Sequence, residues 1–158
     1  MKRCSNRWAA VVAAGALLLA GCAGRQKNDI DISPAQAAQA IAEGVEFTDT
    51  LILAEGDVAN GYYLLDDTVT DYAVYISGSG ATAQEIAVLK VADAADAGHA
   101  EEIVRDRLER LKTMFENYRP DEMAKLQSAV VEVRGNVVYF VCSDDSAKAV
   151  EIIDSLYK

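Results

Sequence analysis

"AVVEVRGNVVYFVC" (residues 129–142) carries the strongest structural signal in the chain. Two runs rich in β-branched and aromatic residues, 130–134 and 137–142, flank the pair Gly135-Asn136. A glycine-asparagine pair between such runs is typical of a two-residue turn, because one or both positions need a positive φ that glycine adopts freely. The stretch therefore predicts a β-hairpin near the carboxyl end of the chain.

Amphipathic helices are predicted on both sides of this hairpin. Before it, apolar residues recur at three- and four-residue steps from Ala97 to Tyr118, and Pro120 disfavours helix beyond that point. After it, the residues around Asp145 supply a cap and first-turn acids for a last helix. The inner face of this last helix would consist of Ala149, Val150, Ile153 and Leu156.

Two further strands are predicted before the long helix. Residues 71–77 (DYAVYIS) alternate between two faces in the way that a strand requires. Residues 85–92 (EIAVLKVA) also indicate a strand, although Thr82 and Glu85 fit the capping box of a helix, so a helix is the alternative there. Together these runs predict a second hairpin.

The predicted order of elements indicates the α+β class. A first helix is expected from Pro34 to Glu43, and residues 45–67 are interpreted as a short strand or turn followed by a short helix. The order is then helix, two strands, helix, two strands, helix. It predicts a four-stranded antiparallel sheet built from two hairpins, with the helices on one face. We expect residues 33–158 to form this single domain.

The amino terminus has the features of an export signal. A basic head precedes an apolar run at residues 9–20, which is shorter than the roughly 20 residues that span a membrane. The motif Leu19-Ala20-Gly21-Cys22 resembles the lipobox of bacterial lipoproteins. That resemblance implies cleavage before Cys22 and attachment of a diacylglycerol to its thiol. We therefore expect a signal peptide at residues 1–21 and a lipidated tether at residues 22–32, on the extracytoplasmic face of the cell membrane.

The expected mature chain is strongly acidic. Removing Lys2, Arg3 and Arg7 with the signal takes the formal net charge from −10 to −13. This charge argues against binding to nucleic acid, whose partners carry basic patches, and against lying flat on anionic lipid. With Cys4 removed and Cys22 lipidated, only one cysteine remains, so no intrachain disulfide is expected.

Catalytic and cofactor signals are weak in this sequence. Gly78-x-Gly80-x-x-Ala83 is similar to a dinucleotide-binding fingerprint, but the glycines fit better as a turn between two strands. His99 is the only histidine and is interpreted as a solvated helix residue, while Cys142 is interpreted as an inert core thiol within a strand. We predict that the protein is not an enzyme, with no cofactor and no metal site.

The segment "NGYYLLDDTVTDY", residues 60–72, is the predicted contact surface. Tyrosines are favoured interface anchors, and acids at the rim of an interface set partner choice and association rate. The candidate contact residues are Tyr62, Tyr63, Asp66, Asp67 and Asp71. They would suit a partner carrying positive charge, or would bind calcium weakly. The alternative is that both tyrosines lie in the core and the acids only solvate a loop.

Three stretches together resemble a known family. They are "GATAQEIAVLKVAD" at 80–93, "YRPDEMAKL" at 118–126 and "AVVEVRGNVVYFVCSDD" at 129–145. Their order and spacing, with the lipobox, are similar to the DUF4358 lipoproteins of clostridia and their relatives, over residues 30–157. The name means domain of unknown function, so the resemblance implies no catalytic residues. It also implies a link to membrane-bound O-acyltransferases, and hence to modification of envelope polysaccharide.

The functional hypothesis from sequence is a lipid-anchored, non-catalytic binding module. Its expected partners are the membrane, through the lipid at Cys22, and an unidentified protein or polymer of the cell envelope. The alternative is an accessory protein or small hydrolase in envelope polysaccharide modification. A purely structural role is a third hypothesis.

Overall fold

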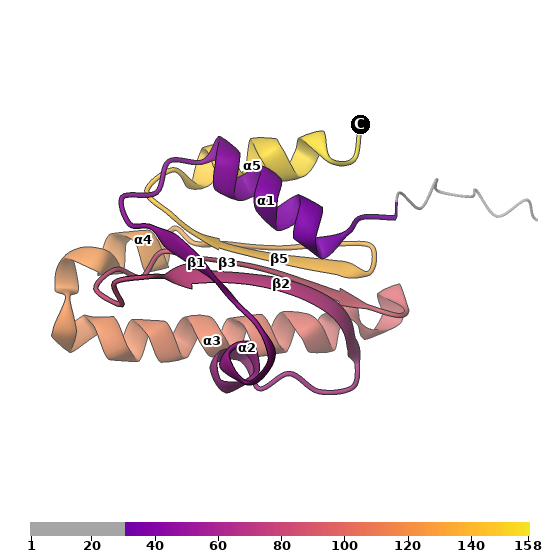
Figure 1. Cartoon of the computed structure of the whole chain (residues 1–158), viewed down its shortest axis with the longest axis horizontal. Helices are drawn as coiled ribbons and strands as arrows, with labels where there is room; N and C mark the ends of the chain where they lie inside the picture. Colours follow the sequence, from indigo (N-terminus) through magenta and orange to yellow (C-terminus); the bar gives the residue numbers. More distant parts are fainter. Residues whose placement is uncertain (1–30) are drawn as a thin grey trace, which may run out of the picture.

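The described residues fold around a five-stranded antiparallel sheet (Figure 1). The computed structural model describes residues 31–158, so the predicted signal peptide and Cys22 lie outside the described residues. The strands lie in the order β1-β2-β3-β5-β4. They are β1 (Leu51–Ala54), β2 (Val69–Ser77), β3 (Glu85–Val91), β4 (Val130–Arg134) and β5 (Val137–Cys142). The helices are α1 (Pro34–Gly44), α2 (Gly56–Tyr63), α3 (Ala97–Tyr118), α4 (Met123–Gln127) and α5 (Ser146–Ser155).

The hairpin predicted from residues 129–142 is confirmed as β4 and β5. Arg134 lies opposite Val137, which leaves Gly135 and Asn136 as the two turn residues. Gly135 has a φ of 61°, the left-handed conformation that favours glycine, and it occupies the first turn position as in a type II′ turn. The long helix α3 and the strand interpretation of residues 85–92 are also confirmed.

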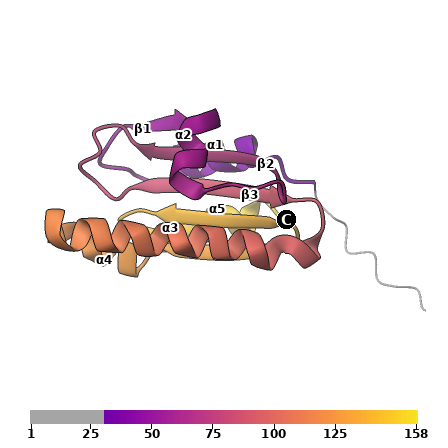
Figure 2. The same cartoon turned by 90° about the horizontal axis from the view of Figure 1, so that it is seen from below.

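Helices cover both faces of the sheet, so the prediction of helices on one face is wrong (Figures 1 and 2). The helices α1 and α5 pack on one face, and α2, α3 and α4 pack on the other. The central strands explain this arrangement. All of β5 and all of β3 except Lys90 are buried, and strands that are apolar on both sides need cover on both faces.

The sheet has five strands rather than the predicted four because β1 adds an edge strand beside β2. The four residues of β1 are too few to show a period in the sequence, and the strand is visible only through its pairing with β2. Its entry into the sheet is a close approach of two backbones at Gly78. A Cβ atom at Gly78 would lie 2.7 Å from the carbonyl oxygen of Thr50, so glycine permits the contact.

Candidate functional site

The structure separates the two tyrosines that were predicted to contact a partner. Tyr63 is 1% exposed and lies in the core between α2, α3 and the sheet. This burial corrects the prediction for Tyr63, because a side chain in the core is not available to a partner. Tyr62 is half-buried, and its ring centre lies 4.5 Å from the guanidinium carbon of Arg107.

Tyr63 belongs to a buried polar cluster that the sequence analysis missed. Arg107 on α3 donates from Nε to Oε1 of Glu85 (2.9 Å) and from Nη2 to Oε2 (2.6 Å), while the Tyr63 hydroxyl donates to Oε1 (2.5 Å). This bidentate pair satisfies both oxygens of a carboxylate inside an otherwise apolar core. Burial next to Glu85 raises the pKa of Tyr63 well above its usual value, so the hydroxyl stays protonated. The cluster joins α2, α3 and β3.

The three candidate aspartates lie in different surroundings. Asp66 accepts a hydrogen bond from the backbone N–H of Thr68 (3.0 Å) and lies 2.7 Å from Nε2 of His99. Asp67 and Asp71 are exposed and form no ion pair among the described residues. Within residues 31–158, no group of three or more histidine, cysteine, aspartate or glutamate side chains is arranged to hold a metal ion.

The contact between Asp66 and His99 predicts a pH dependence. The hydrogen bond from the Thr68 hydroxyl, and then the one from His99, lowers the pKa of Asp66 to about 2, and the bond to Asp66 raises the pKa of His99 above 6.5. The stabilisation by His99 is therefore complete below pH 6.5 and is lost as the pH rises through its raised pKa. The stabilisation by Asp66 is lost as the pH falls from 3.8 toward 2.

This dependence can be measured on a single signal, because the chain contains one histidine. In an NMR titration we expect the imidazole protons of His99 to titrate with a midpoint above 6.5, and Asp66→Asn to move the midpoint back toward that value. The matched control is Asp67→Asn, the neighbouring acid without contact to His99, which should leave the midpoint unchanged. Equal midpoints in the wild type and Asp66→Asn would show that the pair does not form.

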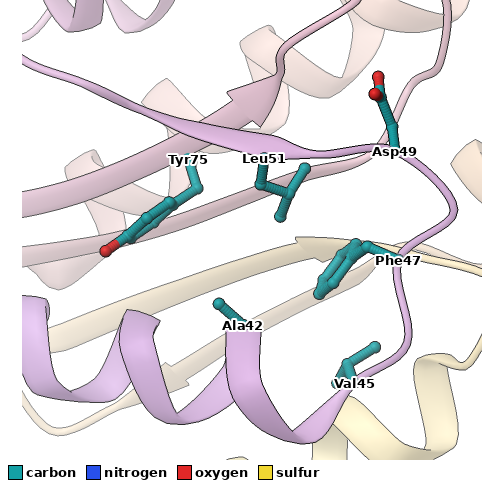
Figure 3. A pocket seen from close by; sticks show the side chains of 6 residues that line it. All are labelled: Ala42, Val45, Phe47, Asp49, Leu51 and Tyr75. Carbon is teal, nitrogen blue, oxygen red and sulfur yellow. The ribbon is translucent and has the colours of Figure 1, made fainter.

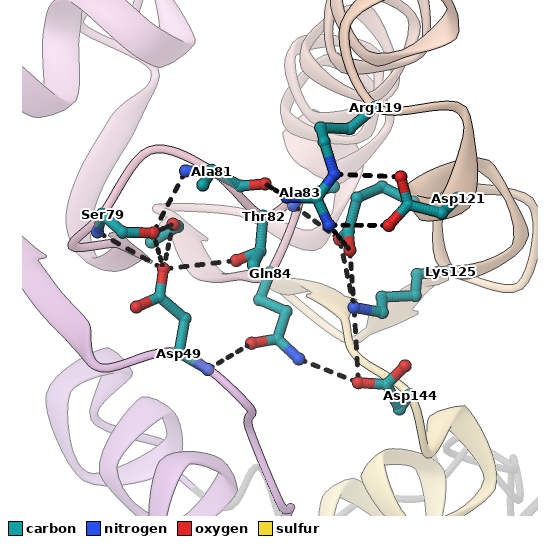
Figure 4. A network of polar contacts seen from close by, with 12 residues as sticks. Asp49, Ser79, Ala81, Thr82, Ala83, Gln84, Arg119, Asp121, Lys125 and Asp144 are labelled. Atoms are coloured by element: carbon teal, nitrogen blue, oxygen red, sulfur yellow. Dashed lines mark hydrogen bonds and ion pairs between the residues drawn. The ribbon is translucent and has the colours of Figure 1, made fainter.

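A network of polar contacts holds the loop between β2 and β3 (Figure 4). The Asp49 carboxylate accepts hydrogen bonds from the hydroxyls of Ser77 and Ser79, which lower the pKa of Asp49 to about 2. Gln84 is buried and continues the network: its Oε1 accepts from the Asp49 backbone N–H (2.9 Å) and its Nε2 donates to Asp144 (3.0 Å). These bonds join β1, β2 and the start of α5.

The far end of this network contains a second buried acid. Glu122 accepts a hydrogen bond from the backbone N–H of Ala83 (3.0 Å) and pairs with Lys125 (3.0 Å). Lys125 also lies 3.5 Å from Asp144, which closes the network (Figure 4). Each of these side chains bonds to a neighbour in the protein through at least one polar atom. The network therefore fixes loop positions.

A groove lies next to the network, between α1 and β1 (Figure 3). Its volume is about 280 Å³. We call it the β1 groove, and it is lined by Ala42, Val45, Phe47, Asp49, Leu51 and Tyr75. The side chains of Phe47, Leu51 and Tyr75 point into the space between β1 and α1, while the Asp49 carboxylate points away from it (Figure 3). Apolar and aromatic side chains therefore form most of the lining, and Asp49 is the one acid among the lining residues.

The charges of the domain are distributed unevenly along the chain. Residues 31–89, which we call the acidic segment, contain no lysine and no arginine. Its acids are Asp31, Glu43, Glu46, Asp49, Glu55, Asp57, Asp66, Asp67, Asp71 and Glu85. Apart from Asp31, Asp66 and Glu85, none of them forms an ion pair among the described residues. The segment supplies α1, β1, α2 and β2, so these four elements contribute acids but no lysine or arginine to the molecule.

The side chains most often used as nucleophile or base, Cys142 and His99, are buried or paired with acids. Burial raises the pKa of the Cys142 thiol to about 12, so it remains a protonated thiol. His99 contacts Asp66 and Glu102 rather than a serine or a cysteine. The glycines of the dinucleotide-like motif lie in the loop between the antiparallel strands β2 and β3, in agreement with their interpretation as a turn. No helix within residues 31–158 is long and apolar enough to cross a membrane.

Comparison with known proteins places the chain in a family. A family profile described as "Domain of unknown function (DUF4358)" matches residues 44–143, which include all five strands and the helices α2, α3 and α4. No curated protein and no solved structure matches the chain. The matched range covers more than half of the chain and agrees with the resemblance predicted from the sequence. The chain belongs to the DUF4358 family of domains of unknown function.

Proposed function

We propose that this protein is a lipoprotein, anchored by a diacylglycerol on Cys22, that presents its domain as a non-catalytic interaction module on the extracytoplasmic face of the cell membrane. Its partner is a protein or polymer of the envelope that carries positive charge. The observation that carries this proposal is the acidic segment, where exposed carboxylates accumulate without a single lysine or arginine between them. Surfaces of one sign attract oppositely charged partners and raise their association rate.

The anchor would hold the domain close to the membrane. Ile32 is buried, and its carbonyl accepts a hydrogen bond from Nζ of Lys90 (3.1 Å), so the domain begins there. Residues 23–30 separate Cys22 from the first described residue, Asp31. A fully extended chain of this length reaches about 30 Å, which is the upper limit on the distance between the lipid and the domain.

The charge of the acidic segment also supports a particular geometry at the membrane. Anionic lipid headgroups repel exposed carboxylates within a Debye length of about 8 Å at physiological salt. The acidic segment is therefore proposed to face away from the bilayer, toward the envelope. The Tyr72 hydroxyl accepts a hydrogen bond from the backbone N–H of Gly56 (3.1 Å), which ties the start of α2 to β2.

The proposal predicts that partner contact depends on the charge of this segment. We expect the triple change Asp66→Asn, Asp67→Asn and Asp71→Asn to reduce the yield of cross-linked partner from intact cells by several-fold, because rim charges act on the association rate. The partner is identified by mass spectrometry of the adduct. Circular dichroism on the purified variant verifies that the domain remains folded.

The matched control removes three exposed acids outside the acidic segment. The variant Asp93→Asn, Asp96→Asn and Glu116→Gln changes the net charge by the same amount, and none of these side chains forms an ion pair among the described residues. Its cross-linking yield should equal that of the wild type. A folded acidic-segment variant that keeps the full yield would contradict the proposed role of this surface.

A further inference from the structure

The edge strand β1 has backbone groups that no described residue pairs. The backbone N–H of Gly78 donates to the carbonyl of Thr50 (2.8 Å), so these two residues are a hydrogen-bonded pair of the antiparallel ladder between β1 and β2. Hydrogen-bonded and non-bonded pairs alternate along such a ladder. The backbone N–H and C=O groups of Leu51 and Leu53 therefore point away from β2, toward the free edge of the sheet.

The edge formed by β1 has little protection against another strand. Natural edge strands are kept short, or are protected by lysine, proline, bulges or a covering segment, and of these β1 shows only its short length of four residues. The side chains of β1 are Leu, Ile, Leu and Ala, and both Ile52 and Leu53 are 48% exposed. The opposite edge of the sheet differs, because β4 carries Glu132 and Arg134, which form an ion pair. The two edges of the same sheet are therefore built differently.

An apolar surface next to β1 could contact the side chains of an added strand. Leu53 lies opposite Tyr75, and both Leu51 and Tyr75 belong to the core on the α1 face of the sheet. Alternate side chains of a strand beside β1 would point to this same face, next to the β1 groove (Figure 3). The groove thus offers an apolar contact to a residue of such a strand next to Leu51.

The charges around β1 favour a particular kind of partner segment at the free edge of this strand. Glu46 and Asp49 precede the strand, and Glu55 and Asp57 follow it. In an antiparallel pairing of two copies of this protein through β1, the acids before the strand in one copy would lie beside the acids after it in the other. Like charges opposite one another are destabilising. A segment with lysine or arginine at both ends would meet opposite charges at both ends of β1.

We infer that β1 receives an extended segment of a partner protein as a sixth strand, and that this segment has alternating apolar residues with lysine or arginine at its ends. Main-chain hydrogen bonds to Leu51 and Leu53 provide affinity, and the β1 groove and the flanking acids provide selectivity. The inference rests on the proposed function and names the chemistry of the partner.

Leu53→Pro is the sharpest test of this inference. Proline removes the N–H group that points to the free edge, and it leaves the hydrogen bonds between β1 and β2 in place, since proline is tolerated on edge strands in this orientation. The probe is a fluorescent peptide with five alternating valine and threonine residues and two lysines at each end. With the full-length protein in detergent, we expect Leu53→Pro to weaken peptide binding about tenfold or more in fluorescence anisotropy, from loss of the outward N–H bond and the clash of the proline ring.

Two controls separate backbone pairing from other effects. Leu53→Ala keeps the outward N–H group and should weaken binding by only a few-fold, from loss of apolar contact. A peptide with glutamates in place of the lysines should bind the wild type about tenfold more weakly at low salt, and this difference should shrink as salt is added.

Amide hydrogen exchange locates the bound peptide. In the free protein the amides of Leu51 and Leu53 should exchange faster than that of Ile52, and saturation with the lysine peptide should protect Leu51 and Leu53 selectively. The inference is overturned if these amides stay unprotected, if Leu53→Pro binds as the wild type does, if the glutamate peptide binds equally well, or if the free protein dimerises through β1. None of these outcomes bears on the lipid anchor or on the effect of the aspartate triple change on cross-linking. The proposed function is therefore tested separately from this inference.

Discussion

Arg107→Ala is expected to lower the free energy of unfolding by about 3–5 kcal/mol, the typical cost of removing one partner from a buried ion pair. The Arg107 guanidinium makes both of its hydrogen bonds to Glu85, whose side chain is 3% exposed. Without it, the Glu85 carboxylate stays in the core with only the Tyr63 hydroxyl as a partner. The uncompensated charge, together with the cavity left by the side chain, destabilises the contact between α3 and the sheet.

Urea unfolding followed by circular dichroism measures this loss. Arg105→Ala is the matched control, because Arg105 lies on the same helix in an exposed pair with Glu101, and such pairs contribute within about 0.5 kcal/mol. The double change Glu85→Gln with Arg107→Met should recover much of the loss, since it removes both charges. Equal losses for Arg107→Ala and Arg105→Ala would contradict the structural role of the buried pair.

Cys22→Ser is expected to abolish incorporation of labelled fatty acid into the protein. A serine hydroxyl does not replace the thiol that the lipobox resemblance identifies as the acceptor of diacylglycerol. Each buried methylene contributes about 0.8 kcal/mol to membrane binding, so the loss of two or three acyl chains removes the whole anchor. The variant should then remain uncleaved or leave the membrane fraction.

Cys4→Ser is the control for this change. It removes a thiol from the same amino-terminal segment, at a position that the proposed cleavage discards, and it should leave both the label and the membrane location unchanged. Cells are labelled with radioactive palmitate, and the protein is immunoprecipitated from the membrane and supernatant fractions. Label that survives in Cys22→Ser would show that the anchor lies elsewhere or does not exist.

Long periodic segments explain which parts of the fold could be predicted. The hairpin of β4 and β5 and the helix α3 each extend over enough residues for the pattern to identify the element and its ends. The order of helices and hairpins does not show which face each helix covers, and the signal for a second helical layer lies instead in "VVYFVC", which is apolar on both sides. A continuous apolar run of this kind indicates a strand that is buried on both faces. The strand β1 is too short to show any period.

The candidate site was predictable only in part, because pairing between distant residues is not visible in a local pattern. Arg107 carried a detectable signal, since it lies within the apolar stripe of α3 between Val104 and Leu111, where an unpaired charge would be costly. Its partner Glu85 could not be identified from spacing. The acidic segment is visible in the sequence, but only the strand order places β1 at the edge of the sheet.

The lipid anchor at Cys22 is tested most directly by the mass of the amino-terminal tryptic peptide of the protein extracted from membranes. We predict a peptide from Cys22 to Arg25 that begins at the cysteine and carries a diacylglycerol on its thiol. A peptide from Trp8 to Arg25 with an unmodified cysteine, in the mature membrane-bound protein, would contradict the proposed anchor.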